Sequence, residues 1–204
     1  VTAIAAPATL RVELTGDGGH AGAVLMPARH DPLVAAAEVI LAVDRAARGS
    51  GREDTVGTVG LLEVEPGAVN SIPRRVRMDI DLRDTDPVAR DRLLEAVRAA
   101  ARDAAATRGV GHHEELLNQD PPAISDPEVL AAIEGACQAL AVPWRHMISR
   151  AYHDCVFMAQ VCPAAMIFVP SRDGVSHRPD EFTAPEDIAR GARVLAGALR
   201  TLSS

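Results

Sequence analysis

The sequence predicts a mixed α/β and α+β protein, in which a ferredoxin-like β-α-β-β-α-β unit precedes an incomplete α/β segment. The unit is predicted by short stretches of alternating apolar and polar residues, typical of half-buried strands, and by long amphipathic stretches, typical of helices. Over residues 8–118 their order gives a four-stranded sheet with both helices on one face. Residues 119–204 have a different pattern, typical of part of a larger α/β sheet.

The first strand is predicted at residues 10–15, where alternate apolar residues lie on one face. After a glycine-rich stretch, a helix is predicted over about residues 33–47. Asp31 and Pro32 predict its start, because aspartate accepts hydrogen bonds from the first free amides and proline fits the first helical turn. Gly49 predicts its end.

The next two strands are predicted at residues 56–65 and 75–83. The second of these, RVRMDIDLR, alternates most regularly and predicts an antiparallel strand with one buried and one solvated face. Asp86 then starts a second amphipathic helix, which ends at about residue 107, and residues 112–118 can form the fourth strand.

In the second half, a helix is predicted from Asp126 to about residue 140, and a final helix starts in a capping box at residues 183–186. The apolar run at residues 164–169 predicts a strand covered on both faces. Such a strand needs neighbours, and residues 147–149 are the one weak candidate. We therefore expect other strands of this sheet to lie upstream of the first residue, which is not methionine.

The composition excludes several functional classes. The chain has 48% hydrophobic and 24% charged residues, which is ordinary for a globular protein. Its net charge is −7, which argues against a nucleic-acid partner, since phosphate binding needs a concentrated basic patch. No apolar run approaches the roughly 20 residues that span a bilayer, and no signal-like segment begins the chain. We therefore expect a cytoplasmic protein without a membrane partner.

The three cysteines are too few and too irregularly spaced for a disulfide framework or a zinc knuckle. Their apolar neighbours predict small core residues without a redox role. They are Cys137, Cys155 and Cys162.

Three histidines lie in contexts that favour function. His20 lies in the glycine-rich GDGGHAG, where a tight turn can present the imidazole on a loop. His153 lies beside Asp154 at the start of a short predicted helix, and His177 follows the predicted buried strand, at an edge where α/β proteins place ligands. Each of these could also be an incidental loop histidine.

Asn70 and Arg83 bracket the hairpin between the second and third strands. An amide and a guanidinium close together would suit a carboxylate ligand, because a guanidinium can bind both carboxylate oxygens. Asn70 could instead only make a turn, and Arg83 could be a solvated strand end.

The sequence contains no nucleophile elbow, P-loop, dinucleotide fingerprint or HExxH motif. A hydrolytic zinc site needs about three protein ligands and an open position. The chain offers His177 and His153 without an acidic cluster that converges on them, so the residues alone do not predict a complete metal site.

Three segments together resemble a known family. They are GDGGHAGAVLMPARHD, VGTVGLLEVEPGAVNSIPRRVRMDIDLRD and MISRAYHDCVFMAQVCPAAMIFVPSRDGVSHRPDE. They are similar, in the same order, to motifs of the metal-dependent amidohydrolases that act on allantoate, ureidoglycolate and N-carbamoyl-L-amino acids. The resemblance extends over essentially the whole chain. Arg150 and Tyr152 replace usual glycines, and RAYHD resembles the ureidoglycolate branch.

The resemblance implies that residues 8–118 are a lid or dimerisation domain and that residues 119–204 are the C-terminal part of the catalytic domain. By matching positions, His177 is implied as a metal ligand and His20 as a catalytic histidine that stabilises the oxyanion across a homodimer. The implied groups that bind a small carboxylate substrate are Asn70, Arg83 and His153.

The implied reaction is hydrolysis of a ureido C–N bond with release of ammonia, by two divalent metals, zinc or manganese, and a glutamate base. The other ligands and the glutamate belong upstream of Val1, so we expect this chain alone to be inactive and to bind metal poorly. Two alternatives remain: a related metallo-aminoacylase or dipeptidase, and a non-catalytic dimerisation or binding module.

Overall fold

The computed structural model describes residues 1–203, which form two compact units. The sheet unit is Ala5–Pro122, and the second unit combines Val1–Ile4 with residues 123–203. Among the described residues, no helix has the length and apolar character that a bilayer span requires.

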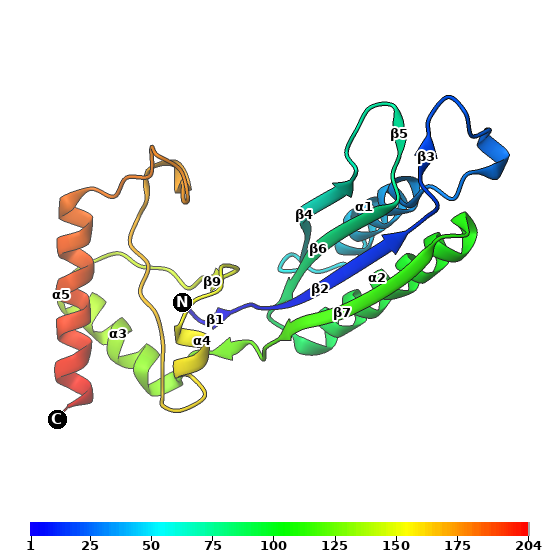
Figure 1. Cartoon of the computed structure of the whole chain (residues 1–204). Coiled ribbons are helices and arrows are strands. Elements are labelled where there is room, and N and C mark those ends of the chain that lie inside the picture. Colours follow the sequence, from blue (N-terminus) through cyan, green and yellow to red (C-terminus); the bar gives the residue numbers. More distant parts are fainter. Residues whose placement is uncertain (204) are drawn as a thin grey trace. The chain divides into compact units, whose positions relative to one another are not determined.

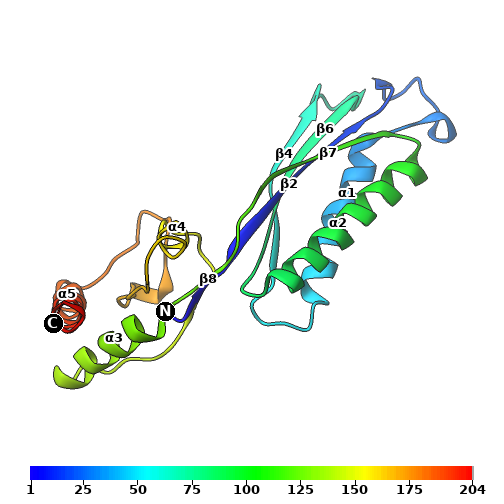
Figure 2. The same cartoon turned by 90° about the horizontal axis from the view of Figure 1, so that it is seen from below.

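The sheet unit has the predicted β-α-β-β-α-β order and ferredoxin-like layout. Its four long strands form one antiparallel sheet in the order β4-β6-β2-β7. Both long helices cover the same face of this sheet (Figures 1 and 2). The elements are β2 (Ala6–Thr15), α1 (Pro32–Arg48), β4 (Val56–Glu65), β6 (Arg75–Asp84), α2 (Pro87–Arg108) and β7 (Gly111–Gln119).

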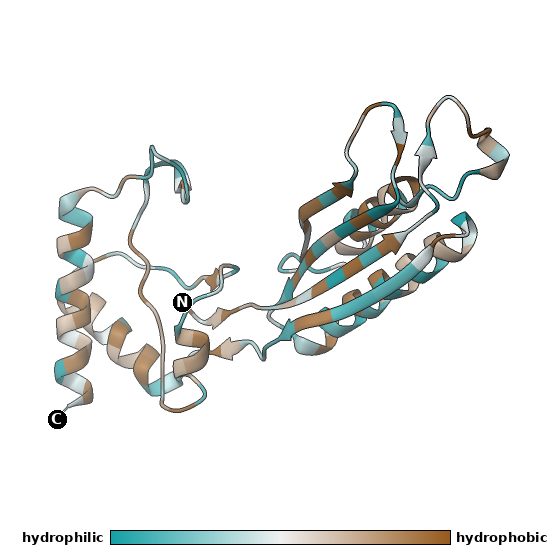
Figure 3. Ribbon diagram, in the orientation of Figure 1, coloured by the Kyte–Doolittle hydropathy of each residue, from teal (hydrophilic) through white to brown (hydrophobic). Residues whose placement is uncertain are grey.

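The core of the sheet unit lies between the sheet and the two helices. Along β6, Val76, Met78, Ile80 and Leu82 are fully buried and alternate with charged residues, as Figure 3 shows by colour. These four side chains pack in one cluster with apolar residues of β2, α1 and α2, almost all of them Ala, Val and Leu. The alternation of apolar and charged residues in the sequence of β6 therefore corresponds to one buried and one solvated face of the strand.

Three helices begin where the Asp-Pro pairs predict. Asp31 accepts a hydrogen bond from the amide of Leu33 at the start of α1. Asp86 at α2 and Asp126 at α3 (Pro127–Ala139) each accept from two amides of the first turn. In all three, the following proline occupies the first turn, where its missing N–H costs nothing.

The second unit is built from short strands and helices. Its three-stranded sheet has the order β8-β1-β9, with β8 antiparallel and β9 parallel to β1. β9 lies within the segment 147–149 that the sequence offers as a weak strand. The elements besides α3 are β1 (Ala3–Ile4), β8 (Ala123–Ile124), β9 (Ile148–Ser149), α4 (Cys155–Met158), the 3-10 turn η2 (Arg172–Gly174) and α5 (Pro185–Leu202).

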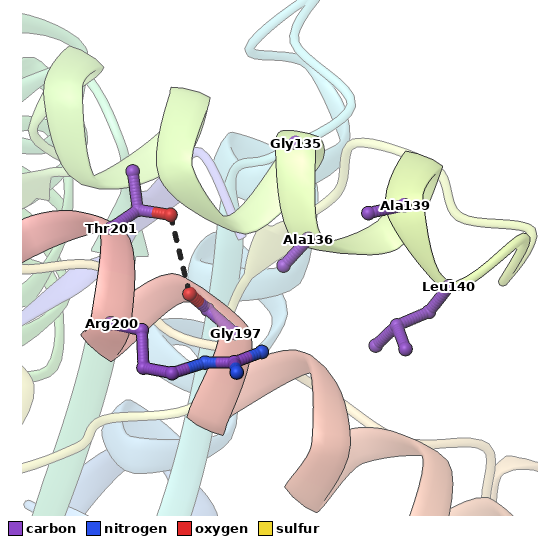
Figure 4. Close-up of a pocket in the computed structure, with 7 residues that line it drawn as sticks. All are labelled: Gly135, Ala136, Ala139, Leu140, Gly197, Arg200 and Thr201. Atoms are coloured by element: carbon purple, nitrogen blue, oxygen red, sulfur yellow. Dashed lines mark hydrogen bonds between the residues drawn. The ribbon is translucent and has the colours of Figure 1, made fainter.

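α3 and α5 pack against each other through small residues. A Cβ added at Gly197 would lie 3.0 Å from the Cβ of Ala136, so the two helices approach closely there. Figure 4 shows the shallow groove beside this contact, lined by residues of these two helices. None of the sequence-predicted site residues lines it.

Two sequence predictions in the second unit are wrong, and a third holds only in part. Residues 164–169 form no strand, and Phe168 is 42% exposed, because no strand among the described residues lies alongside them. The capping box at 183–186 does not form: Ala184 is the N-cap, without a side-chain hydrogen bond, because Pro185 sets the first turn. Of the three cysteines, which the sequence predicts as core residues, Cys137 is buried, Cys155 is partly buried against an apolar cluster and Cys162 is exposed. Burial raises the pKa of the Cys137 thiol, which keeps it protonated.

Candidate functional site

His20 and Asn70 lie next to each other on a small ribbon at one end of the sheet unit. The ribbon pairs β3 (Gly19–His20) with β5 (Ser71–Ile72), and His20 is opposite Ser71. The amide of Ala21 donates to the carbonyl oxygen of Asn70 at 2.9 Å. Both residues are exposed, and the ribbon of β3 and β5 that carries them lies at one end of the sheet unit (Figure 1).

The backbone around His20 fixes how its ring is presented. Gly18 and Gly19 have φ angles of 68° and 125°, which side chains with a Cβ rarely adopt. The amide of Gly22 donates to His20 Nδ1 at 3.1 Å. Since an N–H can only donate, Nδ1 is the unprotonated nitrogen of the neutral ring and Nε2 carries the proton. His20 therefore presents a hydrogen-bond donor.

Arg29 holds the loop that follows His20. Its guanidinium donates from Nε to the carbonyl oxygen of Val24 at 3.0 Å and from Nη2 to the carbonyl oxygen of Ala21. Sequence reasoning missed Arg29, although it lies inside the same motif segment as His20. A basic residue soon after a glycine-rich turn is the signal that could have indicated it.

Arg83 lies near the opposite end of β6 from this ribbon. Its Nε donates to Asp81 Oδ2 at 2.8 Å on the solvated face of the sheet. The ribbon adjoins the Arg75 end of β6, and Arg83 lies eight residue steps further along this strand, about 26 Å away. The expected pairing of the Asn70 amide with the Arg83 guanidinium is therefore not formed within one copy of the chain.

The solvated face around Arg83 is an ion-pair surface. Arg11 Nε and Nη2 donate to the two carboxylate oxygens of Asp79, both at 2.8 Å. These hydrogen bonds lower the pKa of Asp79. A carboxylate that is held ionised in this way has no proton to give at neutral pH, which supports a structural role for it.

In the second unit, His153 lies just before α4 and is half-buried. Its Nε2 is 2.9 Å from Ser149 Oγ, and its ring centroid is 5.6 Å from that of Phe168. Ser149 is 2% exposed. Sequence reasoning missed Ser149, because a buried serine hydroxyl leaves no pattern in a single sequence.

His177 lies in the loop after η2 and is exposed. Its φ angle is 58°, and its amide donates to Glu181 Oε2 at 2.9 Å. Among residues 1–203, no group of three or more His, Cys, Asp or Glu side chains is arranged to hold a metal ion. His177 can supply one ligand, but the described residues do not fit a complete metal centre.

The chain thus has a ferredoxin-like unit with His20 on a small ribbon, and a second unit with His153 and His177 in its loops. The sequence motifs resemble those of metal-dependent hydrolases. Residues 17–201 match the model of peptidase family M20/M25/M40, and the chain belongs to this family.

Named relatives include amidohydrolases. The ureidoglycolate hydrolase of Oryza sativa subsp. japonica is 52% identical over 204 residues, which are 100% of this chain and 42% of that protein. The N-carbamoyl-L-amino acid amidohydrolase of Geobacillus stearothermophilus is 43% identical over 96% of this chain and 47% of its own length.

Solved structures are also similar. The crystal structure of AtUAH in complex with glyoxylate has a TM-score of 0.95 and 49% identity, covering 99% of this chain and 48% of that one. The chain therefore spans about half the length of the relatives that it matches.

Proposed function

We propose that this chain is the lid domain and the C-terminal catalytic segment of a metal-dependent amidohydrolase. Its substrate carries a ureido or carbamoyl group and a carboxylate, with ureidoglycolate foremost, and the reaction releases ammonia. The observation that carries this proposal is the 52% identity to a ureidoglycolate hydrolase over all 204 residues, against 43% for the carbamoyl amino acid enzyme. The RAYHD segment around His153 supports the same branch.

In this proposal the oxyanion is stabilised by His20. Hydrolysis of a ureido carbonyl builds negative charge on its oxygen, and a preorganised donor that meets this charge lowers the barrier. The hydrogen bond from Gly22 to Nδ1 supports the role, because it leaves the Nε2 proton available for donation.

Asn70 and Arg83 bind the substrate carboxylate in this proposal, and His153 lines the pocket. A single carboxylate cannot touch both the ribbon and a side chain about 26 Å along β6. One carboxylate can meet both groups only when they come from different copies. This separation supports a homodimer through the lid, in which each site takes His20 and Asn70 from the partner copy.

Enzymes of this family are generally metal-dependent, and zinc or manganese is the metal we propose, with His177 as one ligand. Because the described residues do not complete a site, the remaining ligands and the general base come from polypeptide outside them. We place the protein in the cytoplasm.

The test is hydrolysis by the full-length polypeptide that contains this chain, supplied with Zn²⁺ or Mn²⁺ and followed by release of ammonia or of a free amino acid. The substrates are ureidoglycolate, allantoate, N-carbamoyl-L-amino acids, N-acyl amino acids and dipeptides. We expect the highest kcat/KM for ureidoglycolate. Turnover of only N-acyl or dipeptide substrates would identify an aminoacylase or dipeptidase. No turnover and no bound metal would identify a binding module.

A further inference from the structure

Ser149 is buried at the end of β9 and has two polar partners. It is 2% exposed, and its place is set by the parallel pairing of β9 with β1, in which Ser149 is opposite Ile4. Its Oγ lies 3.0 Å from the carbonyl oxygen of Ala151 and 2.9 Å from His153 Nε2. All of these residues lie in the second unit.

The number of protons decides the direction of both hydrogen bonds. A carbonyl oxygen only accepts, so the single hydroxyl proton of Ser149 is donated to Ala151. The remaining contact is then satisfied only if His153 Nε2 carries a proton and donates it to Ser149 Oγ. In the neutral ring, Nδ1 is consequently unprotonated and is a hydrogen-bond acceptor.

We infer that Ser149 is a positioning residue that holds His153 in its Nε2–H form, so that Nδ1 is presented to the substrate as an acceptor. The Phe168 ring lies against the imidazole at a centroid distance of 5.6 Å and restricts its rotation. The group that fits an acceptor nitrogen is an N–H donor, such as the terminal amide of a ureido substrate. The identity of the substrate in this inference rests on the proposed function. The protonation of His153 does not, because it follows from the hydrogen bonds alone.

His20 and His153 then have opposite roles in recognition. His20 presents an Nε2 donor, because Nδ1 accepts from the Gly22 amide, and this donor suits an oxygen. His153 presents an Nδ1 acceptor, which suits a nitrogen that carries hydrogen. The His20 nitrogen therefore suits the carbonyl oxygen of a ureido group, and the His153 nitrogen suits its N–H end.

The direct test is the tautomer of His153 in the 204-residue chain. ¹⁵N-histidine labelling and long-range ¹H–¹⁵N NMR at a pH where the ring is neutral distinguish a protonated nitrogen from a bare one. The His153→Gln variant assigns the signal. We expect a protonated Nε2 and a bare Nδ1. A bare Nε2 in the wild-type chain would overturn the inference without any serine variant.

Variants test whether Ser149 is the cause. In Ser149→Ala we expect a mixture of the two tautomers, and in Ser149→Thr, which keeps the hydroxyl, the wild-type form. Ser125→Ala is the matched control, because it removes another buried hydroxyl of the same unit, one that donates to the backbone carbonyl of Val1. Its His153 tautomer should not change. An unchanged tautomer in Ser149→Ala contradicts the inference.

Activity of the full-length polypeptide on ureidoglycolate gives a second readout. We expect kcat/KM to fall about tenfold in Ser149→Ala. This is the lower end of the loss for a metal-ligating histidine that loses its outer hydrogen-bond partner, which we take as the analogous case. Ser149→Thr should recover most of it. An active wild type with unchanged kcat/KM in Ser149→Ala contradicts the positioning role. An inactive wild type refutes the proposed function and leaves the tautomer result to decide this inference.

Discussion

At the scale of single residues, two histidines have one ring nitrogen fixed by the surrounding chain. In His20 the Gly22 amide occupies Nδ1, and in His153 the Ser149 hydroxyl occupies Nε2. The nitrogen that remains for a ligand is therefore different in the two rings. The sequence does not show which ring nitrogen of a histidine is left for a ligand. That depends on the partner in the folded chain, which is a backbone amide for His20 and a buried side chain for His153.

Replacing His20 tests its proposed role as the oxyanion donor. In the full-length polypeptide, His20→Ala should lower kcat about 100-fold, the loss expected when one preorganised donor is removed. His113→Ala is the control, since His113 is an exposed histidine on β7 of the same unit. Steady-state ammonia release measures both variants. Equal kcat values for the two would contradict the role.

Asp84 is a fully buried carboxylate that stabilises the sheet unit. It accepts hydrogen bonds from Arg52, from the Thr55 hydroxyl and from the amide of Asp86. Burial alone would raise the pKa of Asp84, but these hydrogen bonds outweigh it and lower the pKa below the ordinary value. A lowered folded-state pKa means that the ionised carboxylate stabilises the fold above the unfolded pKa of about 3.9. This stability is lost as the pH falls through the folded-state pKa.

Asp84→Asn should therefore lower the free energy of unfolding by about 2 kcal/mol at pH 7, with the half-exposed Arg52 limiting the loss. The difference from the wild type should shrink as the pH falls below about 4, because the carboxylate is then protonated in the unfolded chain while it stays ionised in the fold down to its lowered pKa. Urea unfolding at several pH values measures it. Asp44→Asn, at an exposed pair with Arg48, should change little. A difference in unfolding free energy between the wild type and Asp84→Asn that does not depend on pH would contradict this role of the ionised carboxylate.

At the scale of elements, the sequence predicted best what depends on local chemistry. The helices after Asp31, Asp86 and Asp126 begin where predicted, because a cap and a proline act within one turn. The alternation along β6 also reports burial directly. The strand predicted at residues 164–169 is not formed. A strand needs neighbouring strands to pair with, and an apolar composition alone does not show that they are present.

The candidate site was predicted less completely than the fold. The glycine-rich loop correctly indicated an exposed His20. Asn70 and Arg83 are close in the sequence, but most of β6 lies between them. The sequence alone did not show that this strand carries Arg83 away from Asn70. Arg29 and Ser149 were missed, since both act through backbone carbonyls or buried hydroxyls that only the folded chain brings together.

The loop after His20 depends on Arg29, so Arg29→Ala should loosen it. Without the guanidinium, the carbonyl oxygens of Ala21 and Val24 lose their donor. We expect faster amide hydrogen exchange over residues 20–30 and unchanged exchange in β6. Arg48→Ala, which removes an exposed arginine from the end of α1, is the control. Wild-type exchange of the loop in Arg29→Ala would show that Arg29 does not hold it.

At the scale of the whole molecule, each unit carries only part of the proposed site. The sheet unit has the His20 ribbon and, about 26 Å along β6, Arg83. The second unit has His153 and His177 but no arrangement of ligands among its described residues that completes a metal centre. Together with a chain that spans about half of its relatives, this supports an active site assembled from several stretches of polypeptide.

We propose that the metal centre needs residues outside this chain, and the amount of metal that each polypeptide retains is the test. The 204-residue chain and the full-length polypeptide are dialysed against Zn²⁺ or Mn²⁺, and the retained metal per chain is measured by elemental analysis. We predict about two ions in the full-length polypeptide and none held tightly by the 204-residue chain. Stoichiometric, tight retention by the 204-residue chain, or no retention by the full-length polypeptide, would contradict the claim.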